Sequence, residues 1–165
     1  MPNSNEKEVI KVLMVCLGNI CRSPTAHGVF QHRINLHNLE NSILVDSAGT
    51  SSWHVGASPD RRAANAAKAR GYPLDNLRAR QVTASDFHEF DYILAMDYDN
   101  LIELKARCPD VCEDKLELFL SYSEREDKVV PDPYHSGKDG FELVLDMVEE
   151  ASDRLIAQLI ERHFS

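Results

Sequence analysis

A buried strand that runs into a short polar loop and then a helix is the feature that most constrains this chain. Residues 9–15 form an apolar run, broken only by Lys11, that predicts a buried strand. Ser23 and Pro24 open a predicted helix. Between them, Cys16 ends the strand and Arg22 lies at the mouth of the helix. The five intervening residues are enough to curl backbone N–H groups around an anion, so this loop is predicted to bind a phosphate and attack it.

Strands and helices alternate along the rest of the chain. This pattern implies a parallel sheet covered by helices on both faces, with its ligand crevice beyond the carboxyl ends of the strands. Cys16, Ser47, Asp97 and the loop after the fourth strand should then gather at one edge. In the second helix, Ser58 is predicted as the N-cap, with Gly71 closing the far end. The predicted strands are 9–15, 43–47, 92–96 and 115–119, and the predicted helices are 24–38, 59–71, a short turn from about 83, 98–107 and 141–163.

Length, charge and cysteine usage narrow the class of protein. A chain of 165 residues predicts one domain, with residues 1–7 as a flexible tail. The net charge of −9 argues against nucleic-acid or anionic-membrane binding. No run approaches a membrane-spanning length and no export signal is visible, so we expect a cytoplasmic protein with reduced cysteines. The four cysteines are Cys16, Cys21, Cys108 and Cys112.

Outside the loop, few residues suggest a catalytic or ligand-binding role. Cys108 and Cys112 have no histidine pair or further cysteine at ligand spacing, so we expect no metal site and no cofactor. Basic residues are concentrated in one stretch, which we expect to be a solvated surface. These residues are Lys68, Arg70, Arg78 and Arg80.

The loop carries most of what a cysteine nucleophile needs to hydrolyse a phosphate monoester. A helix N-terminus and Arg22 both favour the thiolate form of a cysteine such as Cys16. Gly18 and its neighbours can turn successive N–H groups inward, and Asn19 tolerates the left-handed backbone that such a curl requires. The planar fork of Arg22 can grip two phosphate oxygens. Ser23 can donate a hydrogen bond to the sulfur.

Two motifs make the sequence similar to a known family. The segment from Cys16 to Pro24 and the later segment from Pro131 to Tyr134 resemble those of the low-molecular-weight protein tyrosine phosphatases. The resemblance implies an α/β fold: a single-domain three-layer sandwich whose four-stranded parallel sheet has the flavodoxin-like order 2-1-3-4, with helices on both faces. It extends over nearly the whole chain, including residues 45–50, 53–56, 58–60, 79–83 and 91–97.

The resemblance also implies roles for individual residues. Cys16 would be the nucleophile that forms a phosphocysteine, and Arg22 would bind phosphate and the transition state. Asp132 would protonate the leaving phenolate and then activate water. A supporting hydrogen-bond network would consist of Asn19, Ser23 and Ser47, and the phosphate-binding loop of Leu17, Gly18, Asn19, Ile20, Cys21 and Arg22.

The resemblance also predicts an aromatic rim and a redox partner, with two departures. Trp53 and Tyr134 resemble the rim that sandwiches a phenyl ring, but His135 stands where the family often has a second aromatic residue. A histidine of the family's supporting network falls at Leu77, so that contact is expected to be missing. Cys21 matches the family's second loop cysteine, and two roles stay open for it: a protective disulfide with Cys16 and a packed thiol.

The implied partners are phosphotyrosine proteins or peptides, with inorganic phosphate or other oxyanions as product or inhibitor, and weak self-association. Three other functions remain to be weighed. Arsenate reduction needs resolving cysteines near the end of the third strand, where this chain has Ala95 and Met96. Phosphoarginine hydrolysis is associated with threonine at the middle loop position, where Ile20 favours aryl phosphate. A non-catalytic phosphate-binding module would not need Asp132.

Overall fold

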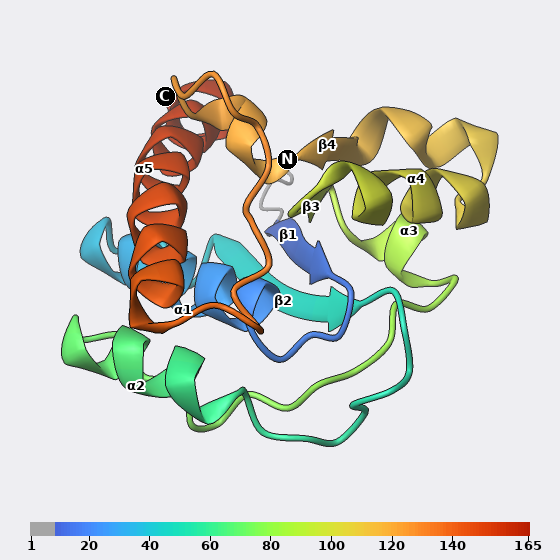
Figure 1. Cartoon of the computed structure of the whole chain (residues 1–165). Coiled ribbons are helices and arrows are strands. Elements are labelled where there is room, and N and C mark those ends of the chain that lie inside the picture. Colours follow the sequence, from blue (N-terminus) through green and yellow to red (C-terminus); the bar gives the residue numbers. More distant parts are fainter. Residues whose placement is uncertain (1–8) are drawn as a thin grey trace.

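The structure is a computed structural model that describes residues 9–165, so the predicted tail at residues 1–7 lies outside the described residues. Helices cover both faces of a central sheet, with α1 and α5 on one side and α3 and α4 on the other (Figure 1). The elements in chain order are β1 (Ile10–Cys16), α1 (Arg22–Leu36), β2 (Ile43–Gly49), α2 (Arg61–Ala69), α3 (Asp86–Glu89), β3 (Tyr92–Ala95), α4 (Tyr98–Arg107), the 3-10 helix η2 (Asp110–Lys115), β4 (Leu116–Leu118), the 3-10 helix η3 (Phe119–Tyr122) and α5 (Lys138–His163).

The sheet has four parallel strands in the order β2-β1-β3-β4, which confirms the predicted topology. β1 pairs with β2 on one side and with β3 on the other, so the strand order reverses around it. In open parallel sheets a ligand crevice forms at such a reversal, outside the carboxyl ends of the strands. Cys16 at the end of β1 and Asp97 just after β3 both lie at that position.

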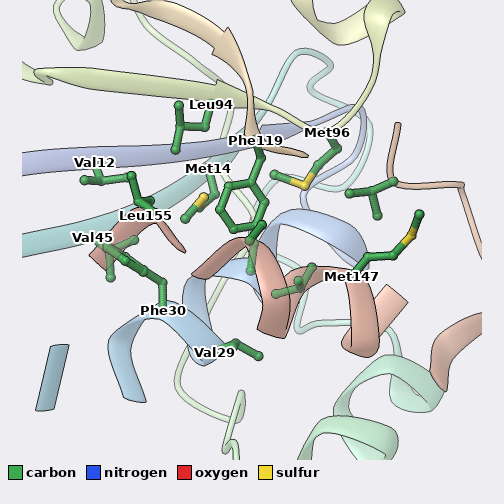
Figure 2. Packing of buried hydrophobic residues seen from close by; sticks show 14 of the residues in the cluster. Val12, Met14, Val29, Phe30, Val45, Leu94, Met96, Phe119, Met147 and Leu155 are labelled. Carbon is green, nitrogen blue, oxygen red and sulfur yellow. The ribbon is translucent and has the colours of Figure 1, made fainter. Parts of the chain in front are cut away.

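The side chains of β1 are buried on both faces, because each face is covered by helices. Successive strand residues point to opposite faces. Val12 and Met14 pack with α1 and α5 in the larger core (Figure 2), whereas Leu13 and Val15 pack with α3 and α4 in a second core. We propose that the described residues form one domain, since a single sheet joins both cores.

Several helix ends depart from the sequence prediction: α1 covers Arg22–Leu36 rather than 24–38, and α2 covers Arg61–Ala69 rather than 59–71. The N-cap of α2 is Asp60 rather than Ser58, because the Asp60 carboxylate accepts hydrogen bonds from the Arg62 and Ala63 N–H groups. A carboxylate satisfies these free N–H groups and also complements the positive end of the helix dipole. α5 begins at Lys138, one turn before the predicted start. Gly71, with φ of +92°, closes the far end of α2 as predicted.

Within the described residues, no helix is both long and apolar enough to cross a membrane.

Candidate active site

The loop between β1 and α1 wraps around the sulfur of Cys16, which is buried. The Asn19 N–H donates to Cys16 Sγ at 3.2 Å, and Ser23 Oγ lies 3.1 Å from the same sulfur. Asn19 has φ of +58°, the left-handed backbone that the sequence predicted for this residue. This conformation turns its N–H inward. The sulfur therefore lies at the N-terminus of α1, with the Asn19 N–H and the Ser23 hydroxyl directed at it.

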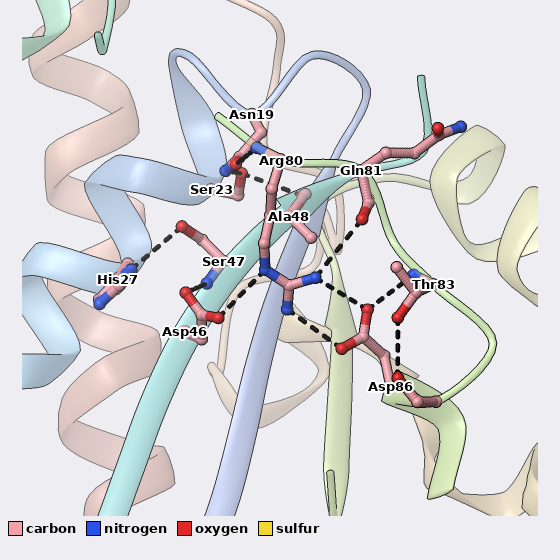
Figure 3. Close-up of polar contacts among 11 residues, drawn as sticks. Asn19, Ser23, His27, Asp46, Ser47, Ala48, Arg80, Gln81, Thr83 and Asp86 are labelled. Atoms are coloured by element: carbon pink, nitrogen blue, oxygen red, sulfur yellow. Dashed lines mark hydrogen bonds and ion pairs between the residues drawn. The ribbon is translucent and has the colours of Figure 1, made fainter. Parts of the chain in front are cut away.

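A network of side-chain hydrogen bonds holds the loop between β1 and α1 in place (Figure 3). Asn19 Nδ2 donates to Ser23 Oγ at 2.8 Å, and Asn19 Oδ1 accepts from the backbone N–H of Arg80 at 2.9 Å. Because Ser23 Oγ accepts from Asn19, its own proton is available for Cys16 Sγ at 3.1 Å or for the Ala48 carbonyl at 3.4 Å. The shorter contact is with the large sulfur atom, so Ser23 is placed to donate to the nucleophile.

Arg80 was missed as a site residue and wrongly placed on a solvated surface. Its guanidinium bonds Asp46 at 3.1 Å and Asp86 at 3.0 and 3.1 Å. These ion pairs hold residues 79–82 beside the end of β2, where they form a bridge at Gly49. A Cβ on Gly49 would lie 2.6 Å from the Leu17 carbonyl oxygen, so only glycine allows this close approach. The Arg80 N–H then reaches Asn19 Oδ1.

Ser47 is linked to this network only through its backbone, because its N–H donates to Asp46 Oδ1 at 2.8 Å and Asp46 pairs with Arg80. Its Oγ pairs instead with His27 Nδ1 on α1 at 3.0 Å (Figure 3). Burial lowers the pKa of His27, although nearby Asp46 opposes this effect. The ring is therefore a neutral hydrogen-bond partner at physiological pH. No sequence pattern pointed to this pair, because His27 comes from a helix with a ragged apolar face.

Arg22 is buried at the first position of α1, with 4% of its surface exposed. Its Nη1 donates to Asp97 Oδ2 at 2.6 Å and to the Val130 carbonyl at 3.0 Å. Burial disfavours the charged form, but Cys16 and Asp97 outweigh this and raise the pKa of Arg22. Asp97 also caps α4 by accepting from the Asn100 N–H at 2.8 Å. The Arg22 guanidinium is thus held beside the Cys16 thiol and is bonded to Asp97, which directly follows β3.

Cys21 has a different environment from Cys16. It packs with Ala63 and Phe141 in a small apolar cluster. Burial, reinforced by the negative charge of Asp60, raises the pKa of the Cys21 thiol to about 12. The Cys21 thiol is therefore protonated at neutral pH.

A hollow of about 270 Å³ opens over the loop. Trp53 lines it with 76% of its surface exposed, as does Tyr134 with 42%, and the exposed Asp132 faces the same hollow. The His135 ring lies edge-on to Tyr134 with centroids 5.0 Å apart, so it takes part in the rim despite not being a phenyl ring. The sequence did not single out His54. The full lining is Leu17, Gly18, Ile20, Cys21, Arg22, Trp53, His54, Asp132, Tyr134 and His135.

The segment that carries Asp132 is buried at Val130 and Pro133, on either side of the exposed carboxylate. Val130 is buried, and its N–H donates to the Met96 carbonyl at 2.9 Å. Beyond it, Asp132 Oδ1 accepts from the Tyr134 N–H at 3.0 Å. The guanidinium of Arg62 lies 5.2 Å from the centre of the Tyr134 ring and 4.9 Å from that of Phe141. Arg62 is thus a side-chain link between α2 and this segment.

Among residues 9–165, no three His, Cys, Asp or Glu side chains are grouped so that they could hold a metal ion. The four cysteines are free thiols.

The fold and the loop define an α/β protein with a cysteine-centred phosphate-binding site, and comparison with known proteins identifies the family. The sequence pattern of "Low molecular weight phosphotyrosine protein phosphatase" matches residues 11–163. The human protein of that name is 42% identical over 141 residues, which are 84% of this chain and 89% of the human one. The chain therefore belongs to the low molecular weight phosphotyrosine protein phosphatase family, and it is a hydrolase of the protein-tyrosine phosphatase class.

Solved structures agree with this assignment. A protein tyrosine phosphatase from Entamoeba histolytica, crystallised with Hepes in its active site, superposes with a TM-score of 0.90 at 44% identity, covering 93% of this chain and 98% of that one. Wzb of Vibrio vulnificus, in complex with benzylphosphonate, has a TM-score of 0.79 at 28% identity, with coverages of 92% and 99%. Oxyanion ligands are therefore bound by homologues of this chain.

A Drosophila arginine phosphatase also superposes, with a TM-score of 0.84 at 38% identity and coverages of 90% and 97%. The fold alone therefore does not distinguish aryl phosphate from phosphoarginine as the substrate.

Proposed function

We propose that this phosphatase hydrolyses aryl phosphate monoesters, including phosphotyrosine in proteins or peptides, through a phosphocysteine on Cys16. The observation that carries the proposal is the environment of that sulfur. It receives the Asn19 N–H and lies beside the Ser23 hydroxyl, and the loop that follows it lines one hollow together with Arg22 and Asp132. Few arrangements supply a nucleophile, an anion cradle and an acid in one such space.

In the first step, the Cys16 thiolate attacks phosphorus. The S–P bond forms, the bond between phosphorus and the phenolic oxygen breaks, and the Asp132 carboxyl gives its proton to the leaving phenolate. Within residues 9–165, all protein contacts of the Arg22 guanidinium use Nη1, so Nε and Nη2 are left to bind two phosphate oxygens. The N–H groups of the loop hold the remaining charge.

In the second step, water attacks the phosphocysteine. The Asp132 carboxylate takes a proton from the water, the S–P bond breaks, and inorganic phosphate and the Cys16 thiolate are released. The Ser23 hydroxyl stabilises the sulfur as a leaving group through the 3.1 Å contact. The same residue serves as acid and then as base because its proton returns at the end of each cycle.

Ile20 and the rim support aryl substrates over phosphoarginine. Trp53 and Tyr134 present two aromatic side chains at the mouth of the hollow, where a phenyl ring can be sandwiched. The Ile20 side chain lines the same hollow and adds apolar surface at the position where we associate threonine with phosphoarginine hydrolysis.

Replacement of the nucleophile tests the proposal. Cys16→Ser should lower kcat for an aryl phosphate by about 10⁴-fold or more, because a serine hydroxyl is not ionised at neutral pH. Inorganic phosphate should still bind, as measured by calorimetry, since its donors are the backbone and Arg22. A Cys108→Ser variant, changed in a thiol outside the hollow, should retain the parent rate. Full activity of Cys16→Ser would overturn the mechanism.

We also propose that Cys21 protects Cys16 against oxidation, in a cytoplasmic enzyme whose four cysteines are free thiols. Peroxide oxidises the Cys16 thiolate to a sulfenic acid and is itself reduced to water. The Cys21 sulfur then attacks, the disulfide forms, and the sulfenic oxygen leaves as water.

The raised pKa of Cys21 makes the closure of this disulfide dependent on pH. Below a pKa of about 12 the thiolate fraction rises about tenfold per pH unit, so closure after peroxide treatment should accelerate by about that factor. Rapid alkylation and mass measurement between pH 7 and pH 9 would follow it. Closure that is independent of pH, or recovery with dithiol that is unchanged in Cys21→Ser, would contradict the protective role.

A further inference from the structure

A second hollow, of about 370 Å³, lies next to the catalytic one. The two share Leu17 and Trp53, so these side chains form the ridge between them. The far wall of the second hollow is the first two turns of α4, which carry Asp99 and Glu103. We call this space the α4 hollow. It is lined by Leu17, Thr50, Ser51, Ser52, Trp53, Gln81, Asp99, Asn100, Glu103 and Arg107.

The α4 hollow contains hydrogen-bond acceptors that lack donors. Asn100 is 3% exposed, and its Oδ1 has no hydrogen-bond partner among the described residues. Ser51, which also lines the hollow, has a buried Oγ that likewise has no partner within residues 9–165. A buried acceptor without a donor costs free energy, which a bound donor can recover. A ligand for this space should therefore bring N–H groups.

The charge of the α4 hollow also favours a cation. Arg107 is paired with Glu103 on the same helix, with Nε to Oε2 at 2.9 Å. Within the part of the chain that the structure describes, no ion pair engages the exposed Asp99 carboxylate. The catalytic hollow on the other side of the ridge is instead built to hold a phosphate dianion. A matching ligand thus carries a phosphate and, within about one residue, a positive charge.

We propose that the α4 hollow binds an arginine or lysine side chain that flanks the phosphotyrosine in a peptide substrate. This inference rests on the proposed function. With the phenyl ring beside Trp53, the neighbouring residue crosses the ridge and places its cation against Asp99. A guanidinium or ammonium group has only donors, which suits acceptors such as Asn100 Oδ1 and Ser51 Oγ. The net charge of −9 attracts such peptides from a distance, while the hollow selects among them at contact.

Matched phosphopeptides test this proposal. Arginine, alanine or glutamate is placed at each position flanking the phosphotyrosine, and kcat/KM is measured with the parent enzyme. At the position that reaches the hollow, arginine should be favoured over alanine by about fivefold. In Asp99→Asn this arginine-to-alanine ratio should fall to about one, and in Asp99→Lys glutamate should be preferred. Using a ratio within each variant cancels any change in its basal rate or stability.

The control is Glu161→Gln, which removes the same charge from the C-terminal end of α5, at the opposite edge of the sheet. Its arginine-to-alanine ratio should equal that of the parent. A parent ratio near one at every position, or an equal fall in Asp99→Asn and Glu161→Gln, would overturn the proposal while leaving the phosphatase function intact. If the parent hydrolyses neither the peptides nor a simple aryl phosphate, the proposed function itself fails.

Discussion

The loop that carries Cys16 and the segment that carries Asp132 face the same hollow, but the fold holds them differently. The Cys16 loop is enclosed by α1, β2 and residues 79–82, and its polar atoms are bonded to one another. The Asp132 segment is buried at Val130 and Pro133, but Asp132 itself and Tyr134 are exposed. The difference follows from the chemistry, because the phosphate group is the same in every substrate whereas the leaving group and the attached peptide vary.

The Cys16 loop, which forms the phosphate cradle, and the exposed acid Asp132 should contribute differently to the stability of the fold. The cradle binds the negative charge of the phosphate, so its hydrogen-bond donors have to be in place before the substrate arrives. The acid only has to meet the leaving oxygen after binding, and apo geometry at such a residue is commonly loose. Changes in the Asp132 segment should therefore affect turnover with little effect on folding, and changes in the cradle should affect both.

Asp132→Asn should have the largest effect on turnover among the changes that distinguish the Asp132 segment from the Cys16 loop. Without an acid, the leaving phenolate departs unprotonated, so kcat should fall by about 10²- to 10⁴-fold. The loss should grow as the phenol becomes more basic, which a series of substituted phenyl phosphates measures. The free energy of unfolding in urea should stay close to that of the parent, since the carboxyl is exposed.

Asp139→Asn, a similar change at an exposed residue in the first turn of α5, is the control and should keep the parent dependence on the leaving group. A loss in Asp132→Asn that is equal for all leaving groups would show that Asp132 is not the acid.

Asn19→Ala, a change within the Cys16 loop, should lower the stability of the protein as well as its rate of hydrolysis. The change removes the bonds to Ser23 and Arg80 and places alanine at φ of +58°. We expect the free energy of unfolding to fall by about 2–4 kcal/mol, from two lost hydrogen bonds and the left-handed backbone. Urea unfolding measures it.

A matched control exists, because Asn38 has nearly the same backbone, with φ of +57°, at the exposed end of α1. Asn38→Ala should cost only the backbone part, about 1 kcal/mol, and should leave turnover unchanged. Equal losses for the two variants would mean that the network around Asn19 contributes nothing to the stability of the cradle.

The sequence predicted the regular parts of this structure well, because they depend on local patterns. α4 was predicted at its observed bounds, and the strand order follows from the family resemblance. The Asn19 conformation was also predictable, since few residues accept a left-handed backbone. What the sequence missed depends on contacts between distant segments: Arg80 reaches back to Asp46 and Asn19, and Ser47 pairs with His27 across two elements. No spacing rule connects such residues.

The smallest expected effect concerns Arg62, a side chain of α2 that contacts the Asp132 segment. The guanidinium of Arg62 stacks on Tyr134 and Phe141, and it is held in place by Asp60 at 3.1 Å. Arg62→Gln removes the stacked cation while keeping a residue that suits a helix. The rim and the acid would then sample more positions, and kcat/KM for an aryl phosphate should fall by about threefold. Arg61→Gln, its exposed neighbour on the same helix with the same change in charge, should keep the parent value. If both variants lose activity equally, the effect comes from net charge, and the cation stacked on Tyr134 does not support the Asp132 segment.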